Sequence, residues 1–172
     1  MCLIVDANCF SQVFDTQDKK HHSFIPVYNW LFTGHGGGLI YGGEKYKKEV
    51  DLRRSKYRPL IVELEKMGRL FEVCNKCVNE IAAELKAAVP DKNFDDEHIL
   101  ALVIVSRCRV VCTEDKVAIS FLKDTSLYPK GVNPPVFYVS ARNARLCRNA
   151  ENIADVCRTN SDMCRRVHET EC

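Results

Sequence analysis

The sequence predicts an α/β domain of three layers, in which helices cover both faces of a central, mostly parallel sheet. Short apolar runs rich in branched residues alternate with helix-length segments along most of the chain, a pattern typical of parallel strands joined by crossover helices. The 172 residues are 46% hydrophobic and 28% charged. This composition suits one folded domain with a sizeable core and excludes general disorder.

Five segments are expected to form strands, and they are 3–6, 39–41, 70–73, 110–112 and 136–139. Helices are expected between them, chiefly at 23–32, 44–52, 59–67, 78–88, 95–106 and 116–123. Pro26 is expected in the first turn of its helix. Gly68 and Pro90 each end a helix. The helix at 95–106 is almost wholly apolar after His98, so we expect it in the interior, capped by an acid at its start.

The chain is expected to divide into a domain of residues 1–140 and a C-terminal helical extension of residues 141–172. In the second segment, arginines alternate with apolar positions, as in an amphipathic helix. This extension is expected to cover the sheet or to dock a partner.

Charge and apolar patterning exclude some classes of protein. The net charge of +2 identifies no partner by itself, and the longest apolar run, 99–105, is too short to span a membrane. The first residues lack the basic start of a signal peptide, so we expect a cytoplasmic protein. The ten cysteines are then expected to be mostly reduced and structural.

Four acidic positions lie where hydrophobic runs end. Asp6 and Asp115 follow the first and fourth expected strands, Asp96 opens the apolar helix, and Glu49 lies in the helix after the second strand. The carboxyl ends of parallel strands meet at one edge of a sheet, where ligands gather. Clustered carboxylates repel one another unless a cation lies between them, so this pattern indicates a Mg²⁺ or Mn²⁺ site.

A basic stretch follows the second expected strand. It contains seven basic residues between Lys45 and Arg58. Such a stretch beside an acidic metal site suits a polyanionic substrate, although a solvated helix face explains the charges equally well. The candidates to follow a nucleic-acid backbone are Lys45, Lys48, Arg53 and Arg54, and Tyr46 is a candidate to stack on a base.

Two further motifs have the spacing of known binding sites. The glycines between Gly38 and Gly43 have phosphate-loop spacing, but Glu44-Lys45 stands where Lys-Ser/Thr is needed. A flexible connector explains them better. Cys74-Asn75-Lys76-Cys77 has the spacing of a zinc or redox motif. A cysteine-based zinc or redox protein is therefore one alternative interpretation of the chain.

The chain resembles the PIN-domain nucleases. The resemblance covers about residues 1–140 and is carried by Ile4-Val5-Asp6-Ala7-Asn8, by Glu49-Val50, by Asp96-Glu97-His98-Ile99-Leu100-Ala101-Leu102 and by Val110-Val111-Cys112-Thr113-Glu114-Asp115. It implies a Rossmann-like fold whose acidic residues hold Mg²⁺ or Mn²⁺ and cut RNA. Many members carry one more acid shortly after the last motif, where this chain has Val117 and Ala118, so the resemblance leaves one or two metals open.

Carried over residue by residue, the resemblance implies that Asp6, Asp96 and Asp115 are metal ligands and that Glu49 is the fourth acid. Glu44 is the rival to Glu49, and Asp95 is the rival to Asp96. Asn8 and Thr113 match polar positions that orient the carboxylates.

The expected function is therefore that of a metal-dependent endoribonuclease, in which carboxylate-bound Mg²⁺ or Mn²⁺ activates water to hydrolyse phosphodiester bonds. The resemblance also leaves open a toxin role, with an inhibitory protein partner, and a homodimer. The alternative is a catalytically weak module of the same fold that binds nucleic acid or regulates another protein.

Overall fold

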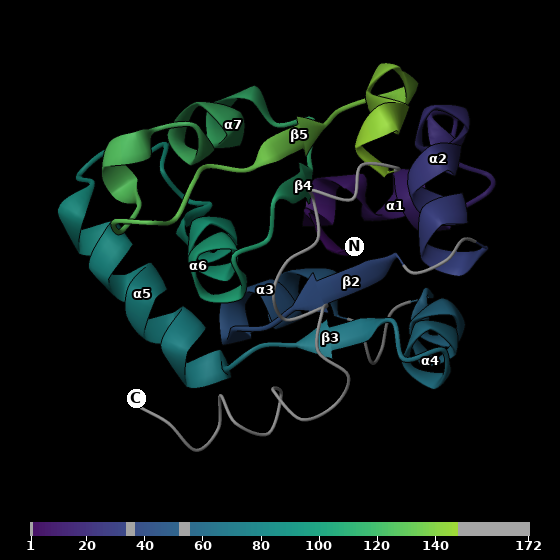
Figure 1. The fold of residues 1–172 in the computed structure, drawn as a ribbon, viewed down its shortest axis with the longest axis horizontal. Helices are drawn as coiled ribbons and strands as arrows, with labels where there is room; N and C mark the ends of the chain where they lie inside the picture. The colour runs from purple at the N-terminus through teal and green to yellow at the C-terminus, as the bar shows by residue number, and fades with distance from the viewer. Residues whose placement is uncertain (1, 34–36, 52–55, 148–172) are drawn as a thin grey trace.

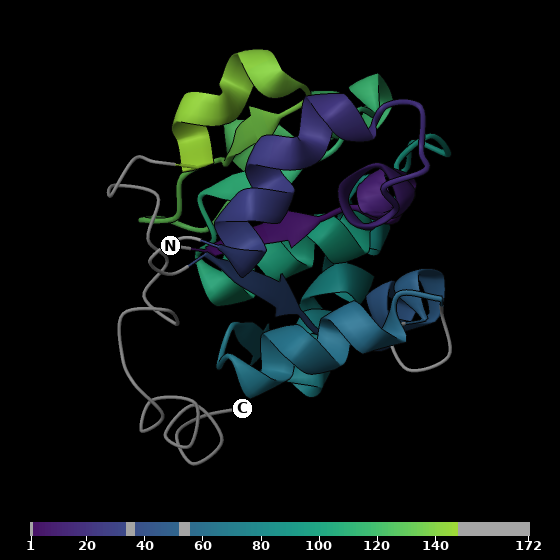
Figure 2. The ribbon, with the colours of Figure 1, turned by 90° about the vertical axis from the view of Figure 1, so that its right-hand side faces the viewer.

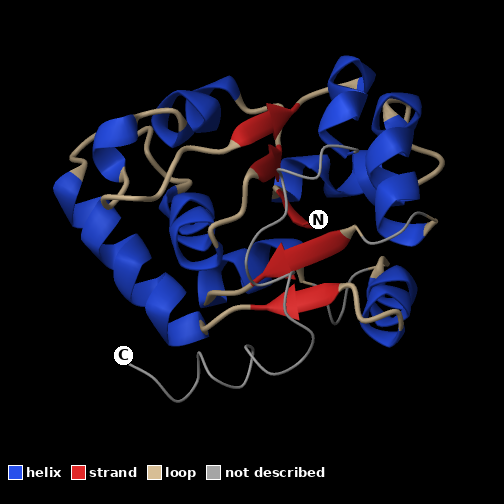
Figure 3. Ribbon diagram, viewed as in Figure 1, coloured by secondary structure: helices blue, strands red, loops and turns tan. Residues whose placement is uncertain are grey.

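All five expected strands are present in the computed structural model, which describes residues 2–33, 37–51 and 56–147. They are β1 (Cys2–Val5), β2 (Gly38–Tyr41), β3 (Leu70–Glu72), β4 (Val110–Cys112) and β5 (Val136–Tyr138). They form one sheet in the order β3-β2-β1-β4-β5, and every neighbouring pair is parallel. The α/β prediction is confirmed, with a sheet that is parallel throughout (Figure 3).

The α-helices are α1 (Phe10–Phe14), α2 (His21–Phe32), α3 (Glu44–Val50), α4 (Arg58–Lys66), α5 (Asn75–Ala88), α6 (Glu97–Ser106) and α7 (Lys116–Leu122). Three short 3₁₀ helices are η1 (Ala7–Cys9), η2 (Thr125–Leu127) and η3 (Ala141–Cys147). The sheet runs through the middle, with α5, α6 and α7 on the left and α2 and α4 on the right (Figure 1). In Figure 2 the right-hand side of Figure 1 faces the viewer, so α2 and α4 lie in front of the strands.

The centre of the core is formed by β1 and α6. All four residues of β1 are fully buried, as expected for the middle strand of a parallel sheet that is covered on both faces. In α6, every residue from Glu97 to Val103 is buried, which confirms the prediction of an interior helix. Asp96 occupies its N-cap position but makes no side-chain capping hydrogen bond.

Two helices begin earlier than the sequence pattern indicates. Helix α5 begins at Asn75, because the Cys74 sulfur accepts a hydrogen bond from the Cys77 amide and caps the first turn. Helix α2 begins at His21, so Pro26 lies inside the helix and not in its first turn.

The C-terminal extension is described only in part. Residues Ala141–Cys147 form η3, which packs against α2 and β5, and the rest of the predicted helical extension lies outside the described residues. Across the described part of the chain, no helix is both long enough and apolar enough to cross a membrane.

The cysteines agree in part with the expectation of reduced, structural thiols. Cys9, Cys108 and Cys112 are buried thiols within the core. Cys2, in contrast, is disulfide-bonded.

The hydroxyl of Tyr46 joins α3 to the end of β1. It is fully buried and donates a hydrogen bond of 2.7 Å to the Val5 carbonyl oxygen. Tyr46→Phe would leave that carbonyl without its partner, so we expect it to lower the free energy of unfolding by about 1–3 kcal/mol. Urea denaturation followed by circular dichroism measures this loss.

Tyr28→Phe is the matched control, because the half-buried Tyr28 makes ring contacts but no hydroxyl hydrogen bond within the described residues. We expect it to change the free energy of unfolding by about 0.5 kcal/mol or less. Equal losses in the two variants would contradict the role assigned to the Tyr46 hydroxyl.

Candidate functional site

Asp6 is held at the carboxyl edge of the sheet by residues from the neighbouring strand. It follows β1, is 5% exposed, and its Oδ2 accepts hydrogen bonds from Thr113 Oγ1 (2.6 Å) and Asn8 Nδ2 (2.9 Å). Thr113 follows β4, which pairs with β1 through Val5 and Cys112. Burial raises the pKa of Asp6 above its usual value, and the Thr113 hydrogen bond opposes this rise.

Asp115 and Asp96 stand at the starts of two helices beside Asp6. Asp115 caps α7, and its Oδ1 accepts from the amides of Val117 (2.7 Å) and Ala118 (3.1 Å). Asp96 precedes α6 and is half-buried. Two acids are thus fixed near helix N-termini, where the amide dipoles favour negative charge.

The four predicted acids are close enough to act on one another. Burial is the largest cause that raises the pKa of Asp96 to about 7, and the charges of Asp6, Asp95, Asp115 and Glu49 raise it further. Burial also raises the pKa of Glu49, to which the charge of Asp6 adds, while Lys45 opposes the rise. These acids, far apart in the sequence, are therefore near enough for their charges to interact.

The donor chemistry at this edge suits a hard divalent cation. Carboxylate oxygens are the ligands that Mg²⁺ and Mn²⁺ prefer, and the charges of Asp6, Asp95, Asp115 and Glu49 all act on Asp96. Within the part of the chain that the structure describes, however, no three His, Cys, Asp or Glu side chains are grouped so that they can hold one metal ion. The acids interact through their charges without forming a closed set of ligands.

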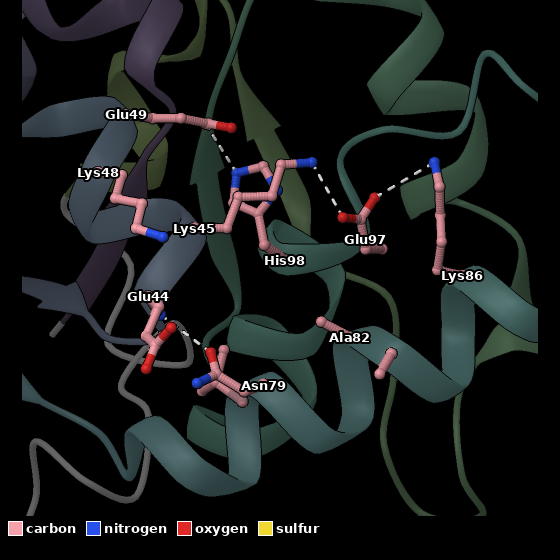
Figure 4. Close-up of a pocket in the computed structure, with 12 residues that line it drawn as sticks. Glu44, Lys45, Lys48, Glu49, Asn79, Ala82, Lys86, Glu97 and His98 are labelled. Carbon is pink, nitrogen blue, oxygen red and sulfur yellow. Dashed lines mark hydrogen bonds and ion pairs between the residues drawn. The ribbon is translucent and has the colours of Figure 1, made fainter.

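The structure also separates the rival acids. Glu44 is exposed, and its side chain lies by Asn79 of α5, away from Glu49 (Figure 4). Glu49 lies against His98, with Oε2 2.9 Å from Nε2. Asp95 is exposed, whereas Asp96 is half-buried. Glu49 and Asp96 are thus the better placed member of each pair, although the charge of Asp95 also raises the pKa of both.

Sequence reasoning missed a buried acid, Glu97. It is 9% exposed and forms ion pairs with Lys45 (2.9 Å) and Lys86 (3.7 Å). Lys45 also donates a hydrogen bond to the Asp95 carbonyl oxygen. The sequence signal for this contact was Lys45 in the basic stretch, because a lysine two residues after Gly43 can turn inward. The pattern does not show which acid this lysine contacts.

His98 is a buried neutral imidazole. It is 2% exposed, and burial, helped by the charge of Lys45, lowers its pKa to about 4. Its contact with Glu49 is therefore not an ion pair at neutral pH. Neither ring nitrogen has an aligned hydrogen bond, which is unusual for a buried polar group.

A cavity of about 450 Å³ opens beside this histidine, between α3, α5 and α6 (Figure 4). Its polar lining comes from Glu44, Lys45, Lys48, Glu49, Asn79, Lys86, Glu97 and His98, and its apolar lining from Gly43, Val78, Ala82 and Ala83. Lys48 is exposed and has no ion-pair partner within the described residues. Among the described residues, the cavity therefore has a lysine without an ion-pair partner next to Glu49, one of the four predicted acids.

Gly43 brings α3 close to α5 at one end of the cavity. Its φ of 75° favours glycine, and a Cβ at this position would lie 2.5 Å from Cγ1 of Val78. The Gly43 amide donates to Asn75 Oδ1 (2.9 Å), and the next amide, of Glu44, donates to Asn79 Oδ1 (2.9 Å).

One nucleic-acid expectation is wrong, and another falls on residues that the structure does not describe. Tyr46 is fully buried, so the prediction that it stacks on a base is wrong: its ring packs in the core because its hydroxyl finds a partner there. Arg53 and Arg54, predicted to follow the nucleic-acid backbone, lie outside the described residues.

Comparison with known proteins gives no relative. No protein-family model matches the chain, and neither the curated proteins nor the solved structures contain a match.

Asp96→Asn tests the uncompensated charge. In the wild type, the pKa of Asp96 is about 7 in the folded state against 3.8 normally, so the free energy of unfolding falls as the pH rises from about 4 to about 7. Asparagine does not ionise, and no side-chain cap is lost. We therefore expect the variant to have the higher Tm at about pH 8, with an advantage that shrinks towards about pH 4.

Differential scanning fluorimetry across this pH range measures the difference, with Asp91→Asn as the control because Asp91 is exposed. A Tm difference for Asp96→Asn that is the same at both ends of the range would contradict the pKa assignment. Manganese at about pH 8 should raise the Tm of the wild type more than that of Asp96→Asn.

Proposed function

We propose that this chain is a metal-dependent ribonuclease that is similar to the PIN-domain nucleases and hydrolyses phosphodiester bonds. The supporting observation is the meeting of Asp6, Asp96, Asp115 and Glu49 at the carboxyl edge of the sheet, with a pKa of about 7 for Asp96. The chain keeps several acids together at a cost in stability, which is expected where a cation binds.

In this proposal Asp6, Asp96, Asp115 and Glu49 hold Mg²⁺ or Mn²⁺. The bound ion would lower the pKa of a water molecule and stabilise the charge that develops on the phosphate. Because the described side chains do not form a closed ligand set, the proposal requires that cation binding draws these carboxylates together.

The residues next to the four acids would orient them or adjust their charge. Thr113 and Asn8 fix Oδ2 of Asp6 and so limit the directions in which the carboxylate can turn, as outer residues of metal sites do. Lys45 is occupied by Glu97 and moderates the pKa of Glu49. Its task is to set the charge beside the acids and not to follow the nucleic-acid backbone.

The cavity beside the acids is the proposed place for the RNA strand. Lys48 lines it, and a cation at this position would bind a phosphate next to the bond that is cut. The nuclease domain would comprise residues 1–140 and act in the cytoplasm, and residues 141–172 would dock a second copy or an inhibitory protein.

One observation favours the alternative, a binding or regulatory module with little catalysis. It is the absence of a three-residue ligand group within the described residues. A module of this kind would bind RNA through Lys48 but would bind Mn²⁺ weakly, which calorimetry detects directly.

Replacing the central acids tests the nuclease. We expect the wild type to cut fluorescent RNA with Mg²⁺ or Mn²⁺ and to stop with a chelator, and a DNA of the same sequence shows the selectivity. Asp6→Asn and Asp96→Asn should abolish cleavage, and Thr113→Val should slow it by about 10- to 100-fold, because it loosens a ligand without removing it.

Glu63→Gln is the matched control, since Glu63 is an exposed acid of α4 that does not line the cavity, and it should keep the wild-type rate. Circular dichroism confirms folding of each variant. Unchanged metal-dependent cleavage in both Asp6→Asn and Asp96→Asn would refute the assignment, and a wild type that binds RNA without cutting it would favour the alternative.

Lys48→Ala tests the RNA-binding cavity. Each phosphate contact to a single strand contributes about 0.7 to the slope of log affinity against log salt. We expect the variant to bind RNA more weakly and its slope to be smaller by about 0.7. Fluorescence anisotropy over a salt series, without divalent metal, measures both quantities.

Lys66→Ala provides the comparison, because Lys66 is an exposed lysine at the end of α4, on the other side of the molecule from α5 (Figure 1). It should leave the slope unchanged. If both lysines had the same effect, the binding would be a general property of the surface and not of the cavity.

A further inference from the structure

The pair Cys74 and Cys77 lies at the start of α5 with its sulfur atoms in contact. Cys77 Sγ donates a hydrogen bond to Cys74 Sγ across 2.8 Å, and the Cys77 amide donates to the same sulfur at 3.3 Å. Both residues are half-buried. Two donors thus converge on one sulfur atom, at the N-terminus of a helix of 14 residues.

We propose that Cys74 and Cys77 form a redox-active dithiol that exchanges with low-molecular-weight disulfides of the glutathione class. Cys74 is the attacking residue. The amide, the neighbouring thiol and the helix dipole all favour its thiolate over its thiol. Cys77 is the resolving residue, because its sulfur already faces Cys74.

The geometry allows the bond to close with little movement. Cys74 is the N-cap residue of α5, and its φ of −53° and ψ of 111° lie outside the helical range, so the pair is not held at the regular helical spacing. The two sulfurs must approach by about 0.8 Å from their separation of 2.8 Å to reach the length of a disulfide. The first turn of α5 can therefore hold the reduced and the oxidised pair.

The reaction is a two-electron exchange. The Cys74 thiolate attacks one sulfur of the small disulfide, whose S–S bond breaks, and one thiolate leaves and takes up a proton. Cys77 then gives its proton to solvent and attacks Cys74 Sγ, which releases the second small thiol. Overall, two protein thiols and one small disulfide become one protein disulfide and two small thiols.

Two cysteines of the core lack the exposure of this pair and do not lie at a helix N-terminus. Cys108 is fully buried, and burial raises its pKa to about 12. Burial likewise raises the pKa of Cys112 well above its usual value. These thiols are expected to be inert in the folded protein, so they provide an internal comparison within the same molecule.

The pair is also linked to the cavity. Asn75, between the two cysteines, accepts the hydrogen bond from the Gly43 amide and donates one to Glu72. A Cys74–Cys77 disulfide would close a ring that contains this asparagine.

Tryptic mapping tests the proposal in the full chain. Trypsin cuts after Arg69, Lys76 and Lys86, so the two cysteines fall in separate peptides, 70–76 and 77–86. The folded protein is equilibrated with graded ratios of oxidised to reduced glutathione, trapped with an alkylating agent and digested without reductant. We expect the two peptides joined to each other at oxidising ratios, while peptide 110–116, which carries Cys112, keeps a free thiol.

Two variants separate the roles. Cys77→Ser should accumulate a mixed disulfide between glutathione and Cys74, because no resolving thiol remains. Cys74→Ser should leave Cys77 to react about tenfold or more slowly than Cys74 does in Cys77→Ser. Unfolding the wild type in urea should remove the excess reactivity of Cys74 over Cys112.

The proposal is overturned if the joined peptides do not appear at any ratio, if Cys74 pairs with a cysteine outside 77–86, or if Cys74 reacts no faster than Cys112 in the folded chain. None of these results depends on nuclease activity, so failure here and failure of the proposed function are distinguishable.

Discussion

The parallel pairing of β1 with β4 is the constraint on which the rest of the site depends. Val5 lies opposite Cys112, so the next residues, Asp6 and Thr113, emerge together at one edge although they are 107 positions apart. The Asp6 amide continues the ladder by donating to the Cys112 carbonyl oxygen at 2.9 Å. A slip of one residue in this pairing would turn the side chains to opposite faces and separate the acid from its partner.

Two neighbouring acids at the start of α6 have opposite electrostatic surroundings. Glu97 is buried, and Lys45 and Lys86 neutralise it. Asp96, one residue earlier, lies among carboxylates: burial raises its pKa to about 7, and the charges of Asp6, Asp95, Asp115 and Glu49 add to this rise. Of these two acids, only Glu97 has an ion pair within the described residues.

The sequence was sufficient to predict the strands and the acids that follow them, because both depend on local patterns. Runs of branched apolar residues mark β1 and β4, and an acid directly after such a run has only one edge of the sheet to occupy. The proximity of Asp6 and Asp115 then follows from the pairing of β1 with β4, whereas the position of Asp96 depends on how α6 packs.

Other features depended on partners that sequence patterns do not show. Tyr46 lies in a charged helix and has the pattern of a surface aromatic, but the Val5 carbonyl holds it in the core. The early start of α5 depends on a sulfur cap, which is rarer than an oxygen cap. The ion pairs of Glu97 join three helices, and only tertiary packing decides which lysine reaches which acid.

The glycine at position 43 has a consequence for any effort to change what the cavity accepts. A larger residue at position 43 is excluded by the positive φ of the backbone and by contact with Val78. A substitution at this position therefore cannot change the size of the cavity. Ala82 and Ala83, which line the cavity from α5, are small residues in a regular helix and are the positions to enlarge. Redesign of ligand size would therefore begin on α5, with the glycine kept as a fixed boundary.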